Sequence, residues 1–188
     1  YYTDIPLRIS TVDQLLPSNN INCLYRDEED VLWIGTSKGV STIRENIITN
    51  LSSPKKIAEP KWWQRLFGFT TERKSFEEPI QAITSWGDCI LLVNTEGLYK
   101  ADRKHDELIR LYNYDITSSL STPLQNITTV MVDFDANIWL AGDQLLKYDI
   151  THNELYKISE NMPFRGRSFL TLTEDINAKS IWIGMERG

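Results

Sequence analysis

The sequence has few of the residues that build metal centres and disulfide frameworks. It contains two cysteines and two histidines in 188 residues, whereas a structural zinc site needs four ligands. Cys23 and Cys89 could form one disulfide, but both lie in short strand-like runs, which favours two free, buried thiols. Cysteine content therefore does not identify the cellular compartment, and neither a metal nor a cofactor is expected.

Two further absences narrow the function. Basic residues are outnumbered by acidic ones, 20 to 26, which gives a net charge of −6 and argues against nucleic-acid binding, since phosphate contacts need clustered Lys and Arg. No apolar run approaches the roughly 20 residues of a membrane helix. No signal peptide is recognisable at Tyr1, so one is either absent or already removed. Hydrophobic residues make up 41% of the chain, which predicts a folded domain.

A short motif recurs along the chain. Residues 31–35, Val-Leu-Trp-Ile-Gly, are repeated with variations at 137–141 and 180–184, and in a degenerate form at 89–93. The anchor positions 33, 91, 139 and 182 are separated by 58, 48 and 43 residues, and four-stranded propeller blades have periods of this order. Each copy follows an alternating run that ends in a turn, and each precedes another such run, which is typical of antiparallel strands.

The sequence therefore predicts an all-β fold of β-propeller blades, each with four antiparallel strands. Full blades are expected at residues 17–51, 79–113 and 125–159, an incomplete fourth at 166–188, and an insertion at 52–78. An open row of blades leaves sheet edges unpaired, and propellers normally close into rings. We therefore expect the chain to be part of a larger, seven-bladed propeller and to fold poorly alone.

The first repeat resembles the two-component regulator propeller repeat. Leu16-Pro17-Ser18-Asn19, the turn at Asp27 and the segment 32–40 follow that repeat's leucine-proline-serine-asparagine, aspartate and leucine-tryptophan-isoleucine-glycine-threonine elements. The fourth repeat matches over residues 175–188, the second lacks the tryptophan and the glycine, and the third is one residue short after Trp139. The resemblance covers most of the chain except residues 52–76.

This resemblance implies the periplasmic sensor region of a Bacteroides-type hybrid two-component system histidine kinase of the inner membrane. In that family two seven-bladed propellers and a β-sandwich precede a membrane helix and a kinase, and many members respond to oligosaccharides. The implied partners are an oligosaccharide ligand, further propeller and β-sandwich domains of the same protein, and a second copy in a homodimer. The kinase activity would lie in other domains. The alternative is a non-sensing scaffold for protein–protein interaction or dimerisation.

Propeller connectivity divides the turns between two faces. Turns between the first and second strands share one face, which collects acidic residues such as those at 27–30 and 133–135. The opposite face holds the turns between second and third strands and the links between blades. Its amides and cations suit sugar hydroxyls and carboxylates, although each is also compatible with an ordinary solvated turn. The ligand surface expected there comprises Asn19, Asn20, Lys38, Gln125, Asn126, Arg165, Arg167 and Arg187.

The insertion carries two adjacent tryptophans, Trp62 and Trp63, within residues 55–74, whose net charge is +4. It joins the first and second blades, so it is expected on the same face as the ligand surface. Three roles are open: packing on its own propeller, contact with a partner domain, and stacking against a sugar, for which large aromatic rings are suited.

No catalytic site is recognisable, so this region is not expected to be an enzyme. Residues 133–137 begin like a calcium-binding EF-hand loop, but Ile138 and Gln144 replace the required Gly and Glu. His105 and His152 fall in equivalent turns of neighbouring blades, too far apart to share a metal. Neither a nucleophile elbow nor a Ser–His–Asp arrangement is evident.

Overall fold

The computed structural model describes residues 15–51, 76–102, 108–113, 124, 126–150, 152, 154–159 and 168–186. Within these ranges the chain forms 14 β-strands in antiparallel sheets. None of these residues forms a helix with the length and apolar character needed to cross a membrane.

The strands form four sheets in chain order. The first sheet contains β1 (Ile21–Arg26), β2 (Leu32–Thr36), β3 (Gly39–Arg44) and β4 (Ile47–Asn50), and the second contains β5 (Ala82–Trp86), β6 (Cys89–Val93), β7 (Gly97–Asp102) and β8 (Leu108–Asn113). The third contains β9 (Thr129–Val132), β10 (Ile138–Ala141), β11 (Leu145–Asp149) and β12 (Glu154–Lys157), and the fourth contains β13 (Phe169–Asp175) and β14 (Ser180–Met185). Each strand pairs with the next, as in a propeller blade.

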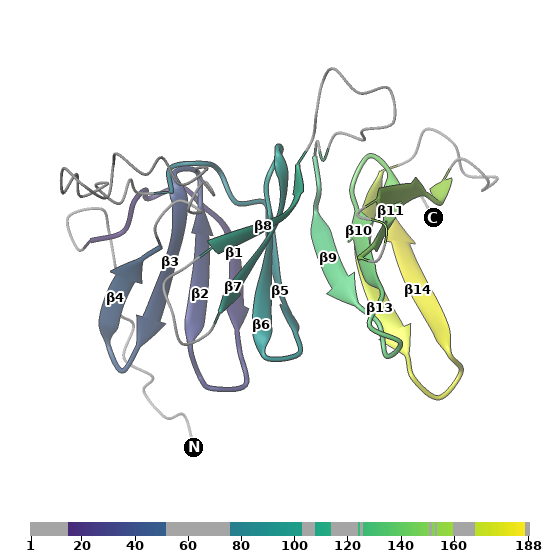
Figure 1. The fold of residues 1–188 in the computed structure, drawn as a ribbon, viewed down its shortest axis with the longest axis horizontal. Coiled ribbons are helices and arrows are strands. Elements are labelled where there is room, and N and C mark those ends of the chain that lie inside the picture. The colour runs from purple at the N-terminus through teal and green to yellow at the C-terminus, as the bar shows by residue number, and fades with distance from the viewer. Residues whose placement is uncertain are drawn as a thin grey trace, which may run out of the picture.

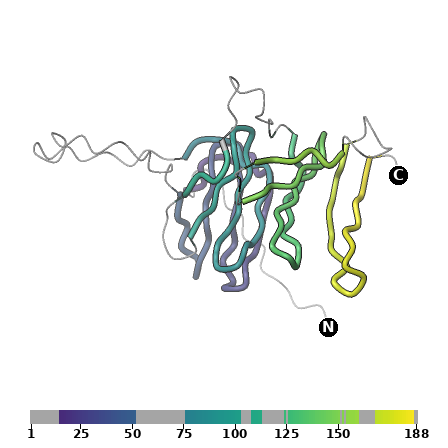
Figure 2. The backbone as a smooth tube through the Cα atoms, turned by 45° about the vertical axis from the view of Figure 1, so that its right-hand side comes forward, coloured from purple at the N-terminus to yellow at the C-terminus, as the bar shows by residue number. Residues whose placement is uncertain are grey.

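The four sheets stand side by side in a row (Figure 1). Their first strands contact one another in succession, β1 with β5, β5 with β9 and β9 with β13. A view turned by 45° shows the β13–β14 hairpin at the end of the row (Figure 2). The turns β1–β2, β5–β6, β9–β10 and β13–β14 lie together at the lower side of Figure 1 and form the turn face. The turns β2–β3 and β6–β7 lie at the upper side, the link face.

The sheets are held together by apolar side chains from both of their faces. On β6, Ile90 and Leu92 join the core shared with the first sheet, whereas Leu91 and Val93 join the core shared with the third. All four side chains are fully buried. A strand that is buried on both faces needs a continuous apolar run, which explains why residues 89–93 do not alternate.

The recurrent tryptophan and the acidic turn are two ends of one interaction, here named the Asp–Trp clasp. Asp27 Oδ1 accepts hydrogen bonds from the backbone N–H groups of Glu29 (3.0 Å) and Val31 (2.9 Å). Asp27 Oδ2 accepts one from the indole N–H of Trp33 at 2.9 Å. The carboxylate thus closes the turn and orients the indole, whose ring joins the core shared with the second sheet.

The third sheet repeats the clasp. Asp133 accepts hydrogen bonds from the backbone N–H of Asn137 at 2.7 Å and from the Trp139 indole at 2.8 Å. Desolvation alone would raise the pKa of Asp133, but the hydrogen bonds from Trp139 and Asn137 outweigh it and lower this pKa below its ordinary value. Trp139 packs against the core shared with the fourth sheet. The clasp therefore couples turn geometry to sheet packing in both places.

We expect Asp27→Ala to lower the free energy of unfolding by about 2–3 kcal/mol, because buried donors lose their acceptor. Chemical denaturation measures this change. Glu28→Ala is the matched control, since Glu28 is exposed in the same turn and its loss should cost less than about 0.5 kcal/mol. Equal losses for the two variants would contradict a structural role for the clasp.

Candidate ligand-binding surfaces

Lys38 lies at the tip of the β2–β3 turn on the link face, where it is exposed. The buried Thr36 hydroxyl accepts a hydrogen bond from the Lys38 backbone N–H at 3.1 Å and donates one to the Gly39 carbonyl at 2.9 Å. Gly39 has a φ of +121°, and a Cβ there would lie 2.0 Å from the Phe76 carbonyl oxygen. Glycine is therefore required at this turn, and the turn presents Lys38 in a fixed place.

The link that precedes β1 is tied to the same turn. The Ser37 backbone N–H donates to the Asn20 carbonyl at 2.9 Å, and the Ser18 and Ser37 hydroxyls are hydrogen-bonded at 2.8 Å. Asn19 is exposed within this link. The structure therefore brings Asn19 and Lys38, two of the predicted site residues, onto one patch.

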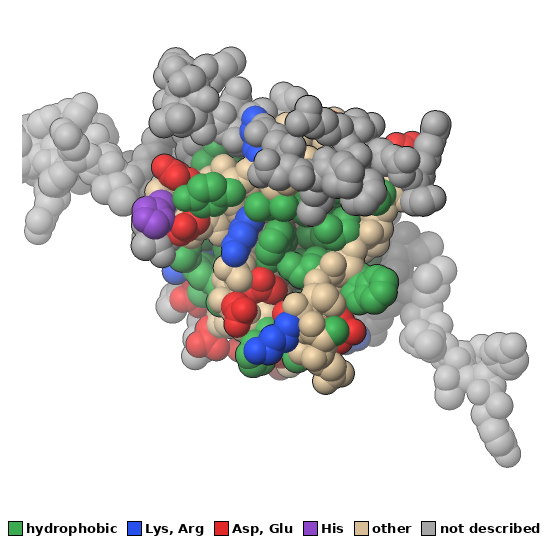
Figure 3. Space-filling model, turned by 90° about the vertical axis from the view of Figure 1, so that its right-hand side faces the viewer, with side chains coloured by type: hydrophobic (Ala, Val, Ile, Leu, Met, Phe, Trp, Pro, Cys, Tyr) green, Lys and Arg blue, Asp and Glu red, His purple; other side chains and the backbone are tan. Residues whose placement is uncertain are grey.

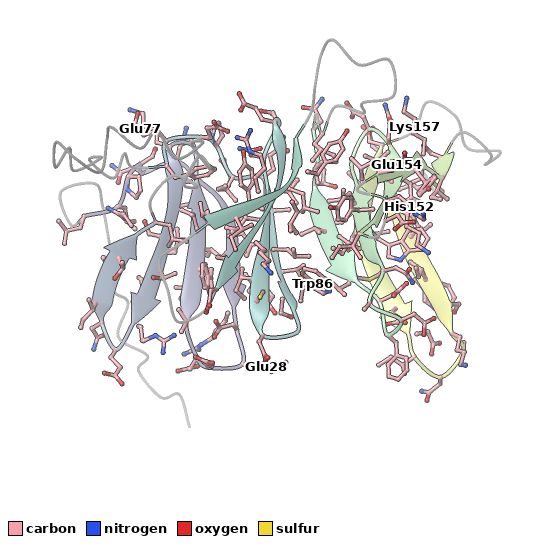
Figure 4. All side chains as sticks on the ribbon, in the orientation of Figure 1. Glu28, Glu77, Trp86, His152, Glu154 and Lys157 are labelled. Carbon is pink, nitrogen blue, oxygen red and sulfur yellow. The ribbon has the colours of Figure 1, made fainter. Side chains whose placement is uncertain are left out.

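A cavity of about 370 Å³ opens beside Lys38, which is within the size range of small-molecule sites. Lys38 and Glu77 supply opposite charges to it (Glu77 is labelled in Figure 4). The Asn50 amide is held in place, because its oxygen accepts from Ser41 at 2.6 Å and its nitrogen donates to the Leu15 carbonyl at 3.0 Å. The cavity is lined by Pro17, Lys38, Asn50, Leu51, Phe76 and Glu77.

Most of the other predicted site residues cannot be placed on this surface. Gln125, Arg165, Arg167, Arg187, Trp62 and Trp63 lie outside the described residues. Asn126 is exposed, and its amide donates to Asp143 at 2.7 Å. The described part of the link face is therefore mixed in charge, because carboxylates accompany the amides and the lysine.

A charged network lies on the link side of the second sheet. The Asn94 amide donates to Glu78 at 2.5 Å, and Arg110 donates to the Tyr99 hydroxyl at 2.7 Å while lying 3.9 Å from Glu96. Burial and the nearby Glu96 carboxylate raise the pKa of Glu78 above its ordinary value of 4.5. Burial likewise raises the pKa of Tyr99. Glu78 and Arg110 lie 16 and 14 residues from Asn94 and Glu96, so no short motif predicts the network.

The turn face is acidic, as its sequence predicts. Glu28, Glu29, Asp30 and Asp135 are exposed there, and Asp and Glu side chains gather along the lower edge of the molecule in Figure 3. Two of the carboxylates have basic partners, Asp30 with Arg26 at 2.7 Å and Glu29 with Arg44 at 3.3 Å. Both ion pairs are exposed, so each stabilises the fold only weakly.

No group of three or more His, Cys, Asp or Glu side chains among the described residues could hold a metal ion. Cys23 and Cys89 are free thiols in β1 and β6, as the sequence indicates, but they are half-buried rather than buried. Burial raises the pKa of Cys23 to about 11 although a hydrogen bond with the Gly35 backbone lowers it. His152, labelled in Figure 4, contacts the Asp149 carboxylate at 2.9 Å in an exposed turn.

Comparison with solved structures identifies the class of fold. The chain is similar to the extracellular domain of the proposed hybrid two-component system BT3049 from B. thetaiotaomicron, with a TM-score of 0.60, 21% identity, and coverage of 95% of this chain and 22% of that one. This similarity confirms the all-β propeller fold. The chain spans about a fifth of the length of that relative.

The repeat itself is also recognised. Residues 15–38 match the model of the two-component regulator propeller family, which confirms the resemblance inferred from the sequence. Two structures of the extracellular domain of BT4673 from B. thetaiotaomicron, proposed as a hybrid two-component and as a one-component system, are 16% and 17% identical. Their TM-scores are 0.48 and 0.49, and each match covers 89% of this chain and 25% of the other. No curated protein matches the chain significantly.

We expect Glu78→Gln to make the fold more stable at neutral pH and to change it little in acid. The raised pKa means that Glu78 contributes stability below its ordinary pKa of 4.5 and loses it as pH rises through the raised value. Glutamine cannot ionise, so the variant does not lose this stability as pH rises. Thermal unfolding of the parent and the variant, from pH values below 4.5 up to neutral pH, measures the difference in stability.

The gain from Glu78→Gln should be smaller when Glu96 has already been changed to Gln, because the neighbouring carboxylate is part of the cause. A variant that is less stable than the parent at neutral pH would instead show that the attraction of Arg110 outweighs burial and repulsion.

Proposed function

We propose that this chain is part of the extracytoplasmic ligand-sensing propeller of a two-component sensor. The observation that carries the proposal is a two-component regulator propeller repeat within a chain whose fold is that of a sensor's extracellular domain. Such a region binds a ligand and passes a change of shape to a histidine kinase elsewhere in the protein. A periplasmic location follows from this role, as does the absence of catalysis in this region.

The ligand class that we propose is an oligosaccharide, bound on the link face around Lys38. The support is local: a cavity of about 370 Å³, a fixed turn that presents the ammonium group, and the exposed Asn19 amide on the same patch. An ammonium and an amide donate several hydrogen bonds to hydroxyl and carboxylate oxygens. Sugars that carry carboxylates would therefore bind better than neutral ones at this position.

We expect uronic-acid oligosaccharides to bind the intact extracellular region in calorimetric titration, and Lys38→Ala to weaken that binding about tenfold, as the loss of one charge-assisted hydrogen bond implies. Lys179→Ala is the matched control, because Lys179 is an exposed lysine in the β13–β14 turn on the opposite face. It should leave the affinity unchanged.

Binding that is indifferent to Lys38→Ala would keep the sensor role and remove the site from this patch. No binding by either neutral or acidic oligosaccharides would favour the alternative, in which the propeller is a scaffold for protein–protein contact.

A further inference from the structure

The second sheet departs from the repeat at one position on the turn face. In the first and third sheets the clasp aspartate lies two residues beyond the strand residue that pairs with the tryptophan, Tyr25 opposite Trp33 and Met131 opposite Trp139. In the second sheet Thr84 pairs with Leu91, so the equivalent of the aspartate is Trp86. An aromatic ring replaces the turn-closing carboxylate, and the turn is closed instead by Gly87 with a φ of +54°.

Trp86 is half-buried and lies between the second and third sheets (Figure 4). A cavity of about 460 Å³ opens beside it, which is ample for a sugar residue. The walls combine aromatic rings, aliphatic side chains and carboxylates from β5, the β9–β10 turn and the β11–β12 region. They are Trp86, Asp135, Ala136, Asn137, Ile138, Lys147, Tyr148, Asp149, Ile150 and Tyr156.

Several polar groups of this cleft are already engaged within the fold. The Tyr148 hydroxyl donates to the Leu111 carbonyl at 3.3 Å, and the Tyr156 hydroxyl donates to Glu154 at 3.2 Å. The Lys147 ammonium lies 5.4 Å from the centre of the Trp139 ring, a cation–π contact. These groups shape the wall of the cleft and have limited capacity to form further hydrogen bonds with a ligand.

Two groups of the cleft remain available. Among the residues that the structure describes, none accepts a hydrogen bond from the Trp86 indole N–H, and none is bonded to or paired with the exposed Asp135 carboxylate. The Trp86 indole offers a flat apolar surface with a hydrogen-bond donor at its edge, and the Asp135 carboxylate offers two acceptor oxygens. A ligand with an apolar face and hydroxyl groups around its rim satisfies both groups.

We propose that this cleft binds a neutral pyranose residue, with its apolar C–H face against the Trp86 ring and its hydroxyl groups donating to Asp135. The acidic turn face disfavours sugars with carboxylate or sulfate groups. The proposal rests on the ligand-sensing role proposed above and adds a site on the opposite face, with a different preference for charge. This role would explain why tryptophan replaces aspartate in the second sheet. The indole provides a stacking surface at the position where the aspartate of the other sheets closes the turn.

The test is calorimetric titration of the intact extracellular region with four neutral probes, namely maltohexaose, cellohexaose, xylohexaose and mannohexaose. At least one should bind, and Trp86→Ala should weaken its affinity by about tenfold or more, as expected for the loss of a stacked ring. Trp86→Phe keeps an aromatic face and should retain most of the affinity. Asp135→Asn, which keeps one acceptor oxygen, should weaken it less than Asp135→Ala.

Asp88→Asn is the matched control, because Asp88 is an exposed carboxylate in the neighbouring β5–β6 turn and does not line the cleft. Thermal unfolding of each variant shows whether the fold is kept, and Asp135→Ala, at an exposed position that lines the cleft, tests the site if Trp86→Ala does not fold. Failure of all four probes at millimolar concentration overturns the proposal, and so does binding that is unchanged in a folded Trp86→Ala variant or in Asp135→Ala. Neither result affects the binding of acidic sugars at Lys38, so the proposals for the two sites are tested independently.

Discussion

The packing of each sheet against its neighbours on both faces is the constraint on which the rest of this structure depends. A four-stranded antiparallel sheet is stable only when its apolar side chains are covered, and here the cover is the next sheet in the row. The fully buried run Ile90 to Val93 shows this most clearly, since alternate residues serve two different cores. The anchor position decides how neighbouring sheets meet: Trp33, Leu91 and Trp139 all point toward the following sheet. Where the structure describes no following sheet, the equivalent Trp182 is 66% exposed, and hydrophobic side chains show on that end of the row in Figure 3.

The strands could be predicted from sequence because the same strand and turn pattern recurs several times along the chain. A single run such as residues 89–93 could belong to a buried helix or a strand, but its spacing from two clear tryptophan motifs settles the question. The acidic turns were also predictable, since aspartate commonly accepts hydrogen bonds from the backbone two residues ahead. What the pattern did not reveal is that the aspartate and the tryptophan six residues later are bonded partners. That relation needs the register of β1 with β2, which places the indole N–H 2.9 Å from the carboxylate.

The candidate sites were harder to predict, for the same physical reason. Lys38 and Asn19 could be assigned to one face because propeller connectivity alone determines on which side a turn emerges. The cleft at Trp86 could not, because its walls come from three separate stretches of chain that meet only when two sheets pack. The one signal in the sequence was negative: the second repeat lacks both residues of the clasp. Trp86 packs against the core shared by the second and third sheets, but a position where one repeat departs from the others is a reasonable place to look for function, and here the departure and the cavity coincide.

The cleft at Trp86 lies where two neighbouring sheets meet. The cavity at Lys38 has walls from the first sheet and from the segment leading into the second, and the cleft at Trp86 has walls from the second and third. Each sheet is internally fixed by its ladder of hydrogen bonds, whereas neighbouring sheets are joined by side-chain packing and by scattered hydrogen bonds such as that from the Tyr148 hydroxyl to the Leu111 carbonyl. A ligand shifts an equilibrium only if it binds one arrangement better than another. A ligand confined to one sheet would have no such preference, but one that touches two sheets binds best at a single angle between them. A site between blades therefore gives a propeller a physical means of converting binding into a change of shape.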